Sequence, residues 1–570
     1  MSNHVSRRSF LKGAGLAALG ATAVGTLSAC GNGYVNAAEL KNPTTQMPGV
    51  PSWLGAAPEI AESEITETLD TEVLVVGCQT GGFPAAISAA ENGAKVLVVE
   101  RRATCATPRE DIGAIDSKLQ QESFEEFPQF RIDKMEAMED IVRYANGFVN
   151  YDLIKLWADE SGALIDWLTD IIERDGRFAM RFEGSIGTPD QGARDKAWAT
   201  GHSPEKLVDD KDVSFMTTLH DYCDELGVEF RMQTELVKCE QDSTGRVTGI
   251  IARDVNDRHY IRVRASKGTI IATGGYVNNT EMMEDRQAFN QRLRISTGIG
   301  GNCTGDGIKA ALWCGAQMDP LGAAVTFNRA CCKPDETAGS DLVGKWFWFG
   351  EQPFLKVNLK GERFCNESGP YDYMLHSTFM QPHHTYADIF DSNYAEHVRQ
   401  FNEVGCCRLY PFDNGAPSNM PIAKMASDFE ALIEAGYMQK ADTIEELAEK
   451  LNLPVEATKA TFERYNQFAE QGKDEDYNKE PYRLIKLDQP PYYGVRTGAW
   501  VLATTDGCMI DTNIHPVDEN GDAIEGLYMV GDCSGGFFSV SYPNLFTGLA
   551  CGRTMTFGRR AGMLAATGQA

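Results

Sequence analysis

The sequence of 570 residues predicts an α/β protein built on a parallel β-sheet. The prediction rests on one local design that recurs at residues 71–100, 267–275 and 525–536, where an apolar β-type run ends in glycine and other small residues. A helical pattern follows the first run directly, and another follows the last run at 547–560. Parallel strands that end in small residues leave room for a ligand against their carboxyl ends, so we expect the main site there.

The composition is that of an ordinary globular protein, with 42% hydrophobic and 24% charged residues. The net charge of −28 and the pI near 4.8 argue against nucleic acid or an anionic membrane surface as a partner. Most of the 15 cysteines lie inside apolar motifs, which does not favour a disulfide framework. The chain has no CxxCH motif, so no covalently attached c-type haem is expected.

The first 65 residues are expected to lie outside the fold. Paired Arg7 and Arg8 precede a short run rich in glycine and alanine, a pattern typical of a twin-arginine export signal. The run ends in LSAC, so Cys30 is predicted to be the lipidated first residue of an exported lipoprotein; the alternative is a chance cysteine at an ordinary cleavage site. Residues 1–30 are thus a signal with a lipid-anchor site, and 31–65 a tether.

The first unit, at 71–100, predicts a strand–turn–helix–strand arrangement that binds a dinucleotide. Gly77 permits the tight turn, Gly82 lets helix and strand pack, and the helix N-terminus offers free N–H groups to a phosphate. Glu100, at the end of the second strand, can accept hydrogen bonds from a ribose diol. Gln79 replaces the usual middle glycine, although its side chain can point away if φ stays negative, and Gly81 adds flexibility nearby. The alternative is a purely structural unit with a glycine-rich turn.

Five motifs in order extend this prediction over the whole chain: ATGG, TGDGI, FLKVNLKGERFCNES, PPYYG and GLYMVGD. Together they resemble the flavoprotein subunit family of fumarate reductases, ketosteroid dehydrogenases and related FAD-dependent ene-reductases, from about 71 to 562. The resemblance implies FAD as cofactor and a discontinuous Rossmann-like FAD-binding domain at 66–280 and 425–570. An inserted α+β capping domain at 281–424 would close over the flavin.

The resemblance also assigns the FAD contacts. Gly77, Gly81 and Gly82 would line the pyrophosphate. Glu100 would bind the adenosine ribose, and Asp532 would bind the ribitol. The N–H groups that open the last helix would face the N1–C2 edge of the flavin, where a helix N-terminus stabilises the negative charge of the reduced ring. The implied residues are Gly77, Gly81, Gly82, Glu100, Gly113, Ala272, Thr273, Gly274, Thr304, Gly305, Asp306, Asp532, Gly548 and Leu549.

The substrate-binding residues of a fumarate reductase are largely missing. Ala503 stands at or near the family's histidine, and SYPNLFTGLACG at 541–552 has no arginine. Tyr542 in this stretch is similar to the tyrosine of the ketosteroid dehydrogenase branch that hydrogen-bonds a substrate carbonyl. A phenol suits a neutral enone or lactone better than a dicarboxylate, because it polarises the carbonyl without a full charge. Glycines that follow the Tyr-Pro pair in that branch are not matched here, and the alternative for Tyr542 is packing under the helix.

The capping domain offers candidate proton donors in Tyr394, Arg399, His383 and His384, although a His or Tyr in such a domain more often serves local structure. The aromatic run KWFWFG at 345–350 could wall a large substrate, but interior packing is favoured, and the Arg and Glu of GERFCNE are expected to brace each other. We therefore expect an exported FAD-dependent oxidoreductase that reduces a C=C bond conjugated to a carbonyl in a small enone, lactone or cinnamate-type molecule.

Electrons would come from an external, membrane-associated cytochrome or quinol-linked donor, with the substrate as a respiratory electron sink in an anaerobe. The alternatives are a ketosteroid-type dehydrogenase that works in the oxidative direction, a fumarate reductase, and a flavin electron-transfer lipoprotein without a substrate of its own.

Overall fold

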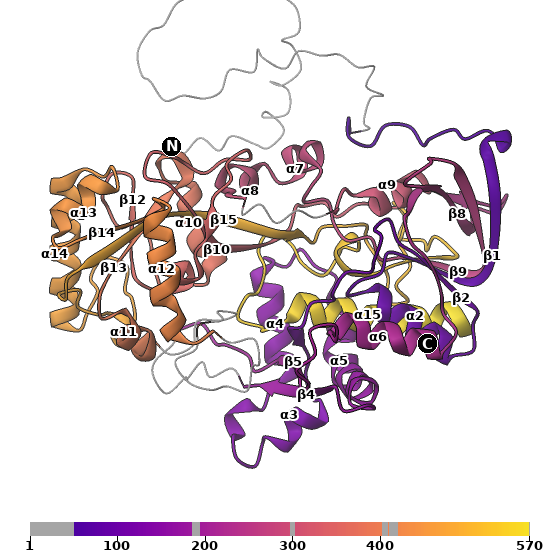
Figure 1. Cartoon of the computed structure of the whole chain (residues 1–570), viewed down its shortest axis with the longest axis horizontal. Helices are drawn as coiled ribbons and strands as arrows, with labels where there is room; N and C mark the ends of the chain where they lie inside the picture. The colour runs from indigo at the N-terminus through magenta and orange to yellow at the C-terminus, as the bar shows by residue number, and fades with distance from the viewer. Residues whose placement is uncertain (1–50, 185–193, 297–301, 402–408, 410–419, 569–570) are drawn as a thin grey trace, which may run out of the picture. The chain divides into compact units, whose positions relative to one another are not determined.

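A seven-stranded sheet carries the recurring strand motifs in the computed structural model (Figure 1). The structure describes residues 51–184, 194–296, 302–401, 409 and 420–568. The strand order is β6-β2-β1-β9-β8-β7, and β16 also pairs with β9. The strands are β1 (Ile65–Val76), β2 (Val96–Val99), β6 (Glu229–Arg231), β7 (Thr234–Gln241), β8 (Val247–Asp254), β9 (Tyr260–Ile271) and β16 (Leu527–Met529).

The register of this sheet brings the predicted ligand edge together. Val76 of β1 pairs with Val99 of β2 and with Ile271 of β9, and Ile271 pairs in turn with Met529 of β16. All of these pairings are parallel, so four strands end at one level. The last three residues of each of these strands are buried, as expected where a sheet is covered on both faces.

Two helices pack closely beneath this edge, α2 (Gly82–Glu91) and α15 (Leu549–Thr567). A Cβ atom on Gly562 of α15 would lie 2.2 Å from the Ala85 carbonyl oxygen of α2, and one on Gly558 would lie 2.6 Å from the Gly81 oxygen. Small residues thus let the two helix backbones approach each other, which places the middle of α15 against the first half of α2.

Helices and a small sheet from residues 112–225 adjoin α15. They are β3 (Ile112–Gly113), β4 (Phe178–Glu183), β5 (Gly201–Lys206), α3 (Lys118–Glu122), α4 (Lys134–Tyr144), α5 (Tyr151–Ile172) and α6 (Phe215–Glu225), and α9 (Asp306–Trp313) packs on β7. Helix α5 carries a continuous buried face that includes Trp157 and Leu164, and its N-cap Asn150 accepts the Asp152 N–H at 3.1 Å.

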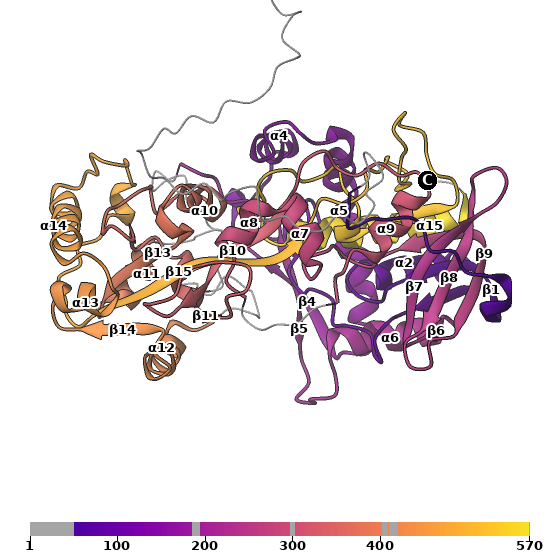
Figure 2. The same ribbon diagram turned by 90° about the horizontal axis from the view of Figure 1, so that it is seen from above.

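A second sheet forms the capping part, in the order β11-β10-β15-β13-β12, with β14 also paired to β15. Figure 2 shows β15 running from this part toward α7 and α9. The strands are β10 (Ala324–Cys332), β11 (Lys345–Trp346), β12 (Leu355–Asn358), β13 (Tyr386–Asp391), β14 (Met438–Ala441) and β15 (Tyr492–Thr504). The helices around it are α7 (Thr280–Arg286), α8 (Ala288–Leu293), α10 (Tyr371–Phe379), α11 (Tyr394–Phe401), α12 (Met425–Glu434), α13 (Ile444–Lys450) and α14 (Val455–Gln471).

The second sheet extends past the predicted boundary at 424. Residues 425–504 supply α12, β14, α13, α14 and β15, and their apolar side chains belong to the same core as β12 and β13. The family resemblance implied that this stretch belongs to the FAD-binding domain. The sheet that β15 joins is determined by its hydrogen bonds to strands that are distant in sequence. The local sequence pattern of a strand does not predict which strands it pairs with.

The N-terminal end of the folded unit also differs from the predicted tether. Residues Ser52–Ala570 form one compact unit, in which Trp53 is buried and its indole N–H donates to the Asp285 carboxylate at 2.8 Å. The predicted signal residues Arg7, Arg8 and Cys30 lie outside the described residues. Within the described part of the chain, no helix combines the length and the apolar character needed to cross a membrane.

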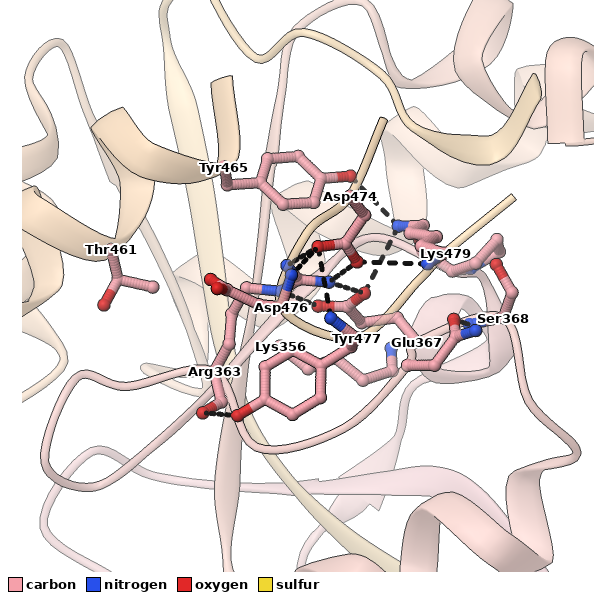
Figure 3. Close-up of polar contacts among 12 residues, drawn as sticks. Lys356, Arg363, Glu367, Ser368, Thr461, Tyr465, Asp474, Asp476, Tyr477 and Lys479 are labelled. Atoms are coloured by element: carbon pink, nitrogen blue, oxygen red, sulfur yellow. Dashed lines mark hydrogen bonds and ion pairs between the residues drawn. The ribbon is translucent and has the colours of Figure 1, made fainter. Parts of the chain in front are cut away.

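A buried ionic cluster joins two distant parts of the capping region (Figure 3). Arg363 donates to Glu367 at 2.8 Å and to Asp474 at 2.8 Å, and Lys479 lies 3.6 Å from Glu367. The side chains of these four residues are at most 4% exposed. This pairing confirms the expected brace between the Arg and the Glu of GERFCNE and adds the segment after α14 to it.

Candidate active site

A pocket opens at the carboxyl edge of β1, β2 and β9. Six residues predicted to contact FAD line it: Gly77, Glu100, Ala272, Thr273, Thr304 and Asp306. Arg101 and Arg102 also line it, so the pocket offers both acceptors and cations to a polar ligand. The structure thus assembles the predicted adenosine side from segments that are more than 200 positions apart in the sequence.

The turn after β1 has a backbone that only glycine fits at two positions. Gly77 has φ +98°, and a Cβ atom there would lie 2.6 Å from the Ala272 carbonyl oxygen. A Cβ atom on Gly82 would lie 2.1 Å from the Gly77 oxygen. The turn therefore presses against the end of β9, and α2 begins directly at it with its first N–H groups at the sheet edge.

Glu100 has protein partners of its own. Its carboxylate accepts the Cys78 backbone N–H at 2.9 Å and the Arg102 backbone N–H and Nε at 3.0 Å each. The carboxylate therefore clamps the turn to the end of β2, and a ribose diol would share it with Arg102. This second task was not foreseen from the sequence, because Arg102 and Cys78 are ordinary residues of a loop and a turn.

The remaining predicted residues surround the same edge. Gly274 and Gly305 have positive φ, and Gly305 is the N-cap of α9, where Thr304 Oγ1 donates to Asp306 at 2.8 Å. Gly81 is the N-cap of α2 and packs against Val530. These residues surround the ligand edge, and their contacts with FAD stay predictions.

A second group lies where α15 begins. The Gly113 N–H donates to the Gly548 carbonyl at 2.8 Å, and Gly548 is the N-cap of α15 with φ +76°. A Cβ atom on Gly113 would lie 2.7 Å from Leu549 N, so the two segments touch through their backbones. Asp532 lies in the short helix after β16, at the same edge.

These features fit FAD. Helices α2 and α15 both begin at this edge, and the positive end of a helix dipole suits the anionic parts of a dinucleotide. The carboxylates of Glu100 and Asp532 suit hydroxyl groups, and glycine backbones form the walls between them. The residues that would hold FAD are therefore those of the pocket and of the Gly113–Gly548 contact.

Tyr542 lies in a tight turn just before α15. It is 4% exposed, and its hydroxyl oxygen accepts the N–H of Ala550, the second residue of α15, at 3.1 Å. The preceding Val540 has φ +62°, a strained value for a β-branched residue, and Ser541 N–H donates to the Ser539 carbonyl at 2.6 Å. The turn thus directs the phenol at the start of α15.

Asp372 holds this turn from the capping side, which sequence reasoning missed. Its carboxylate accepts the backbone N–H of Tyr542 and the Thr326 hydroxyl, the latter at 3.1 Å. It is 1% exposed, and burial raises its pKa to about 7. The available signal was PYDY at 370–373, shortly after the FCNES motif, where the family resemblance implies an arginine that this chain lacks.

An aromatic group extends from α10 along β10 and β15. The Tyr371 ring lies 5.4 Å from Phe327, which stacks on Trp500 at 5.8 Å, and Trp500 lies 4.2 Å from Trp346. Within KWFWFG the side chains alternate: Phe347 and Phe349 are buried in the second core, whereas Trp346 and Trp348 are half-buried and stack on each other. Interior packing therefore accounts for half of that run, and the tryptophans form the partly exposed half.

The other proton-donor candidates lie away from Tyr542. Tyr394 and Arg399 are on α11, which Figures 1 and 2 both show well apart from α15. Tyr394 packs among Phe349, Phe390 and Phe429 of the second core, and Arg399 is half-exposed and paired with Glu396.

The two histidines also have local structural partners. His384 stacks on Phe379 at 4.8 Å and contacts its carbonyl at 2.7 Å, and His383 precedes it in the same turn. The structure does not bring these four candidates to the Tyr542 turn, because β13 and its neighbours hold them on the capping side.

Sequence comparison places the chain among flavoproteins. It is 28% identical over 506 residues to the vinyl phenol reductase of Lactiplantibacillus plantarum, covering 87% of this chain and 96% of that protein. It is 30% identical to the 3-oxosteroid 1-dehydrogenase of Mycobacterium tuberculosis over 350 residues, 56% of each chain.

Structural comparison agrees at the level of the fold. The open form of a flavocytochrome c3 fumarate reductase matches with a TM-score of 0.62 and 22% identity, over 92% of this chain and 84% of that one. The family model described as an FAD binding domain matches residues 72–544. The chain therefore belongs to the FAD-binding-domain family, and it is an FAD-dependent oxidoreductase.

Proposed function

We propose that this protein reduces a C=C bond conjugated to a carbonyl in a small neutral molecule such as an enone or an unsaturated lactone. The observation that carries the proposal is Tyr542, a buried phenol held at the start of α15 by Ala550 and by Asp372. Accepting an N–H at a helix N-terminus polarises the phenol and strengthens it as a donor to a carbonyl oxygen. The relatives, a vinyl phenol reductase and a 3-oxosteroid dehydrogenase, support chemistry at carbon–carbon bonds.

FAD, when bound, supplies the hydride. Tyr542 holds and polarises the substrate carbonyl, and Asp372 keeps the Tyr542 turn in place from α10. Tyr371, which precedes Asp372 on α10 and packs against Phe327, is our candidate for the donor of the proton that the α-carbon receives. The half-buried tryptophans of the aromatic group favour a flat, apolar or aryl substrate.

A dicarboxylate is disfavoured on charge. Ala503 lies on β15 opposite Val325, and the Tyr542 turn contributes no cation between residues 541 and 552. Buried carboxylates require paired cations, and arginine is the usual choice. Asp372 adds a carboxyl group at the same place and no cation.

The oxidative direction is the second candidate, because the Ser-Tyr-Pro turn is present and one relative is a 3-oxosteroid dehydrogenase. Anaerobic incubation of the oxidised protein with a saturated ketosteroid would bleach the flavin band if this direction is the working one.

We further propose that the protein is exported by the twin-arginine route and anchored by lipid at Cys30, outside the cytoplasmic membrane. The motif around Arg7 and Arg8 and the LSAC sequence support this. An external cytochrome or quinol-linked donor would supply electrons, since the sequence has no haem-attachment motif, and the substrate would serve as a respiratory electron sink.

The test is anaerobic reoxidation of the chemically reduced flavin. An enone steroid, an unsaturated lactone, a cinnamate, a vinyl phenol and fumarate are added separately, and the visible flavin band is followed. We expect rapid reoxidation by a neutral conjugated acceptor and a loss of about 100-fold in Tyr542→Phe, the size of effect seen when one donor to a developing oxyanion is removed. Tyr222→Phe is the matched control, because the Tyr222 hydroxyl bonds only to Glu91 among the described contacts, on the surface of α6. Rapid reoxidation by fumarate alone would overturn the proposal.

A further inference from the structure

The segment 101–111 closes over the turn that begins α2. The Ala106 N–H donates to the Cys78 carbonyl at 3.1 Å, and the Arg109 N–H donates to Thr80 Oγ1 at 3.1 Å. Gln79 turns toward this segment, with its side-chain amide 3.4 Å from the Thr107 carbonyl, and its backbone stays outside the left-handed region. The side chain that replaces the usual glycine is therefore directed at this segment, and Gln79 also lines the pocket at the sheet edge.

Three arginines of this segment each pair with an acid at the sheet edge. Arg101 lies 3.1 Å from Asp306, Arg102 lies 3.0 Å from Glu100, and Arg109 lies 3.2 Å from Asp532. All three acids were assigned to FAD contacts by the sequence. In a chain with a net charge of −28, this pairing keeps the edge from repelling an anionic ligand.

Arg109 differs from the other two arginines in position. Arg101 and Arg102 line the pocket beside β2, on the adenosine side. Arg109 instead joins three segments: Thr80 at the start of α2, Asp532 after β16, and Cys551 in the first turn of α15, whose thiol donates to the Arg109 carbonyl at 3.3 Å. Its side chain is 29% exposed, so part of it is accessible at this junction.

A dinucleotide that binds at this edge places its diphosphate at the start of the helix that follows the first strand, here α2. The diphosphate carries two negative charges, whereas a helix N-terminus supplies about half a positive charge. Asp532 would repel the diphosphate if it were unpaired. A guanidinium has five N–H donors, so it can keep Asp532 and still offer donors to phosphate oxygens.

We propose that Arg109 is a cofactor-binding residue that neutralises the diphosphate of FAD while pairing with Asp532. A glycine in place of Gln79 would let the backbone of the turn approach the diphosphate closely. The Arg109 side chain of segment 101–111 then supplies the contact with the diphosphate that the turn loses at Gln79. The inference depends on the family's cofactor and is independent of which alkene is reduced.

The test measures FAD release from the full, FAD-loaded chain. Release is followed by the rise in flavin fluorescence on dilution, at low and at high salt. We expect Arg109→Met to release FAD about 10- to 100-fold faster at low salt, the range for loss of a charge-assisted hydrogen bond. The release rate of the wild type should rise with salt, because salt screens the attraction between Arg109 and the diphosphate. The release rate of Arg109→Met should change much less with salt, because this variant lacks that attraction.

Two further variants keep the test decisive. Arg109→Lys retains the charge and should recover part of the affinity, even if the methionine variant folds poorly. Arg174→Met, on the surface and paired with Glu225, is the control and should release FAD at the wild-type rate. Wild-type release rates and salt dependence in both Arg109 variants would overturn the proposal.

Discussion

At the scale of single residues, the conformation of the Tyr542 turn depends on a group that is far away in sequence. The phenol is oriented by Ala550, but its backbone N–H is held by Asp372, which is 170 positions earlier. Burial raises the pKa of Asp372 from its ordinary value of 3.8 to about 7. The contact between Asp372 and the Tyr542 turn therefore depends on the protonation of this carboxyl group. The dependence can be tested by measuring stability as well as activity at different pH values.

We expect Asp372→Asn to flatten the dependence of stability on pH. The folded protein keeps the Asp372 proton up to about pH 7, whereas the unfolded chain releases it near pH 4. The folded state therefore binds more protons in this window, and the free energy of unfolding of the wild type falls as pH rises through it, by up to about 4 kcal/mol. Asparagine does not ionise and removes this contribution.

Denaturant unfolding at pH 5 and pH 8 checks this expectation. The difference between the two pH values should be smaller for Asp372→Asn than for the wild type. The exposed residue Asp341 provides the control Asp341→Asn, which should follow the wild type. Parallel curves for Asp372→Asn and the wild type would contradict the assignment.

At the scale of elements, the glycine positions and the buried ionic cluster explain why segments that are distant in sequence stay together. The sequence predicted the β1–α2 turn, the strands that end at the ligand edge and the helix after residue 547, because each has a local pattern. It did not predict that 425–504 completes the second sheet, because the pairing of β15 with β10 and β13 is a long-range choice. The Arg363–Glu367–Asp474–Lys479 cluster belongs to this long-range part.

We expect Glu367→Gln to destabilise the protein by about 3–5 kcal/mol, because Arg363 and Lys479 would share one carboxylate fewer in a buried place. The denaturant midpoint should fall markedly. Glu396→Gln removes the exposed partner of Arg399 and is the matched control, for which the midpoint should stay close to that of the wild type. Equal midpoints for the two variants would show that the cluster does not hold the capping region together.

At the scale of the whole molecule, the FAD edge and the capping sheet meet where β15 ends. Thr504 accepts the Tyr276 N–H at 2.8 Å, and the Tyr276 hydroxyl donates to Asp506 at 2.7 Å. Arg286 of α7 pairs with the same Asp506 at 2.8 Å. The proposed substrate site adjoins this junction, so both parts of the fold contribute to it: Asp372 from the cap and Tyr542 from the turn before α15.

The proposed anchor predicts where the full chain resides in the cell. Cys30→Ser should move the protein from the membrane fraction to the soluble fraction, because the lipid would have no attachment site. Cys314→Ser, a half-buried cysteine of the folded unit, is the control and should leave the protein in the membrane fraction. Fractionation followed by immunodetection distinguishes these outcomes, and a Cys30→Ser chain that stays with the membrane would contradict the anchor.

The sequence by itself determined the α/β class, the cofactor edge and the absence of an arginine in the Tyr542 turn, since each depends on residues close together in the chain. Only the tertiary structure showed that Arg109 pairs with Asp532 and that Asp372 holds the Tyr542 turn. It also showed that Tyr394 and Arg399 lie on α11, away from this turn. The physical reason is that strand pairing and buried charge pairing join residues hundreds of positions apart. Local patterns of hydrophobicity and turn residues carry no record of such partners.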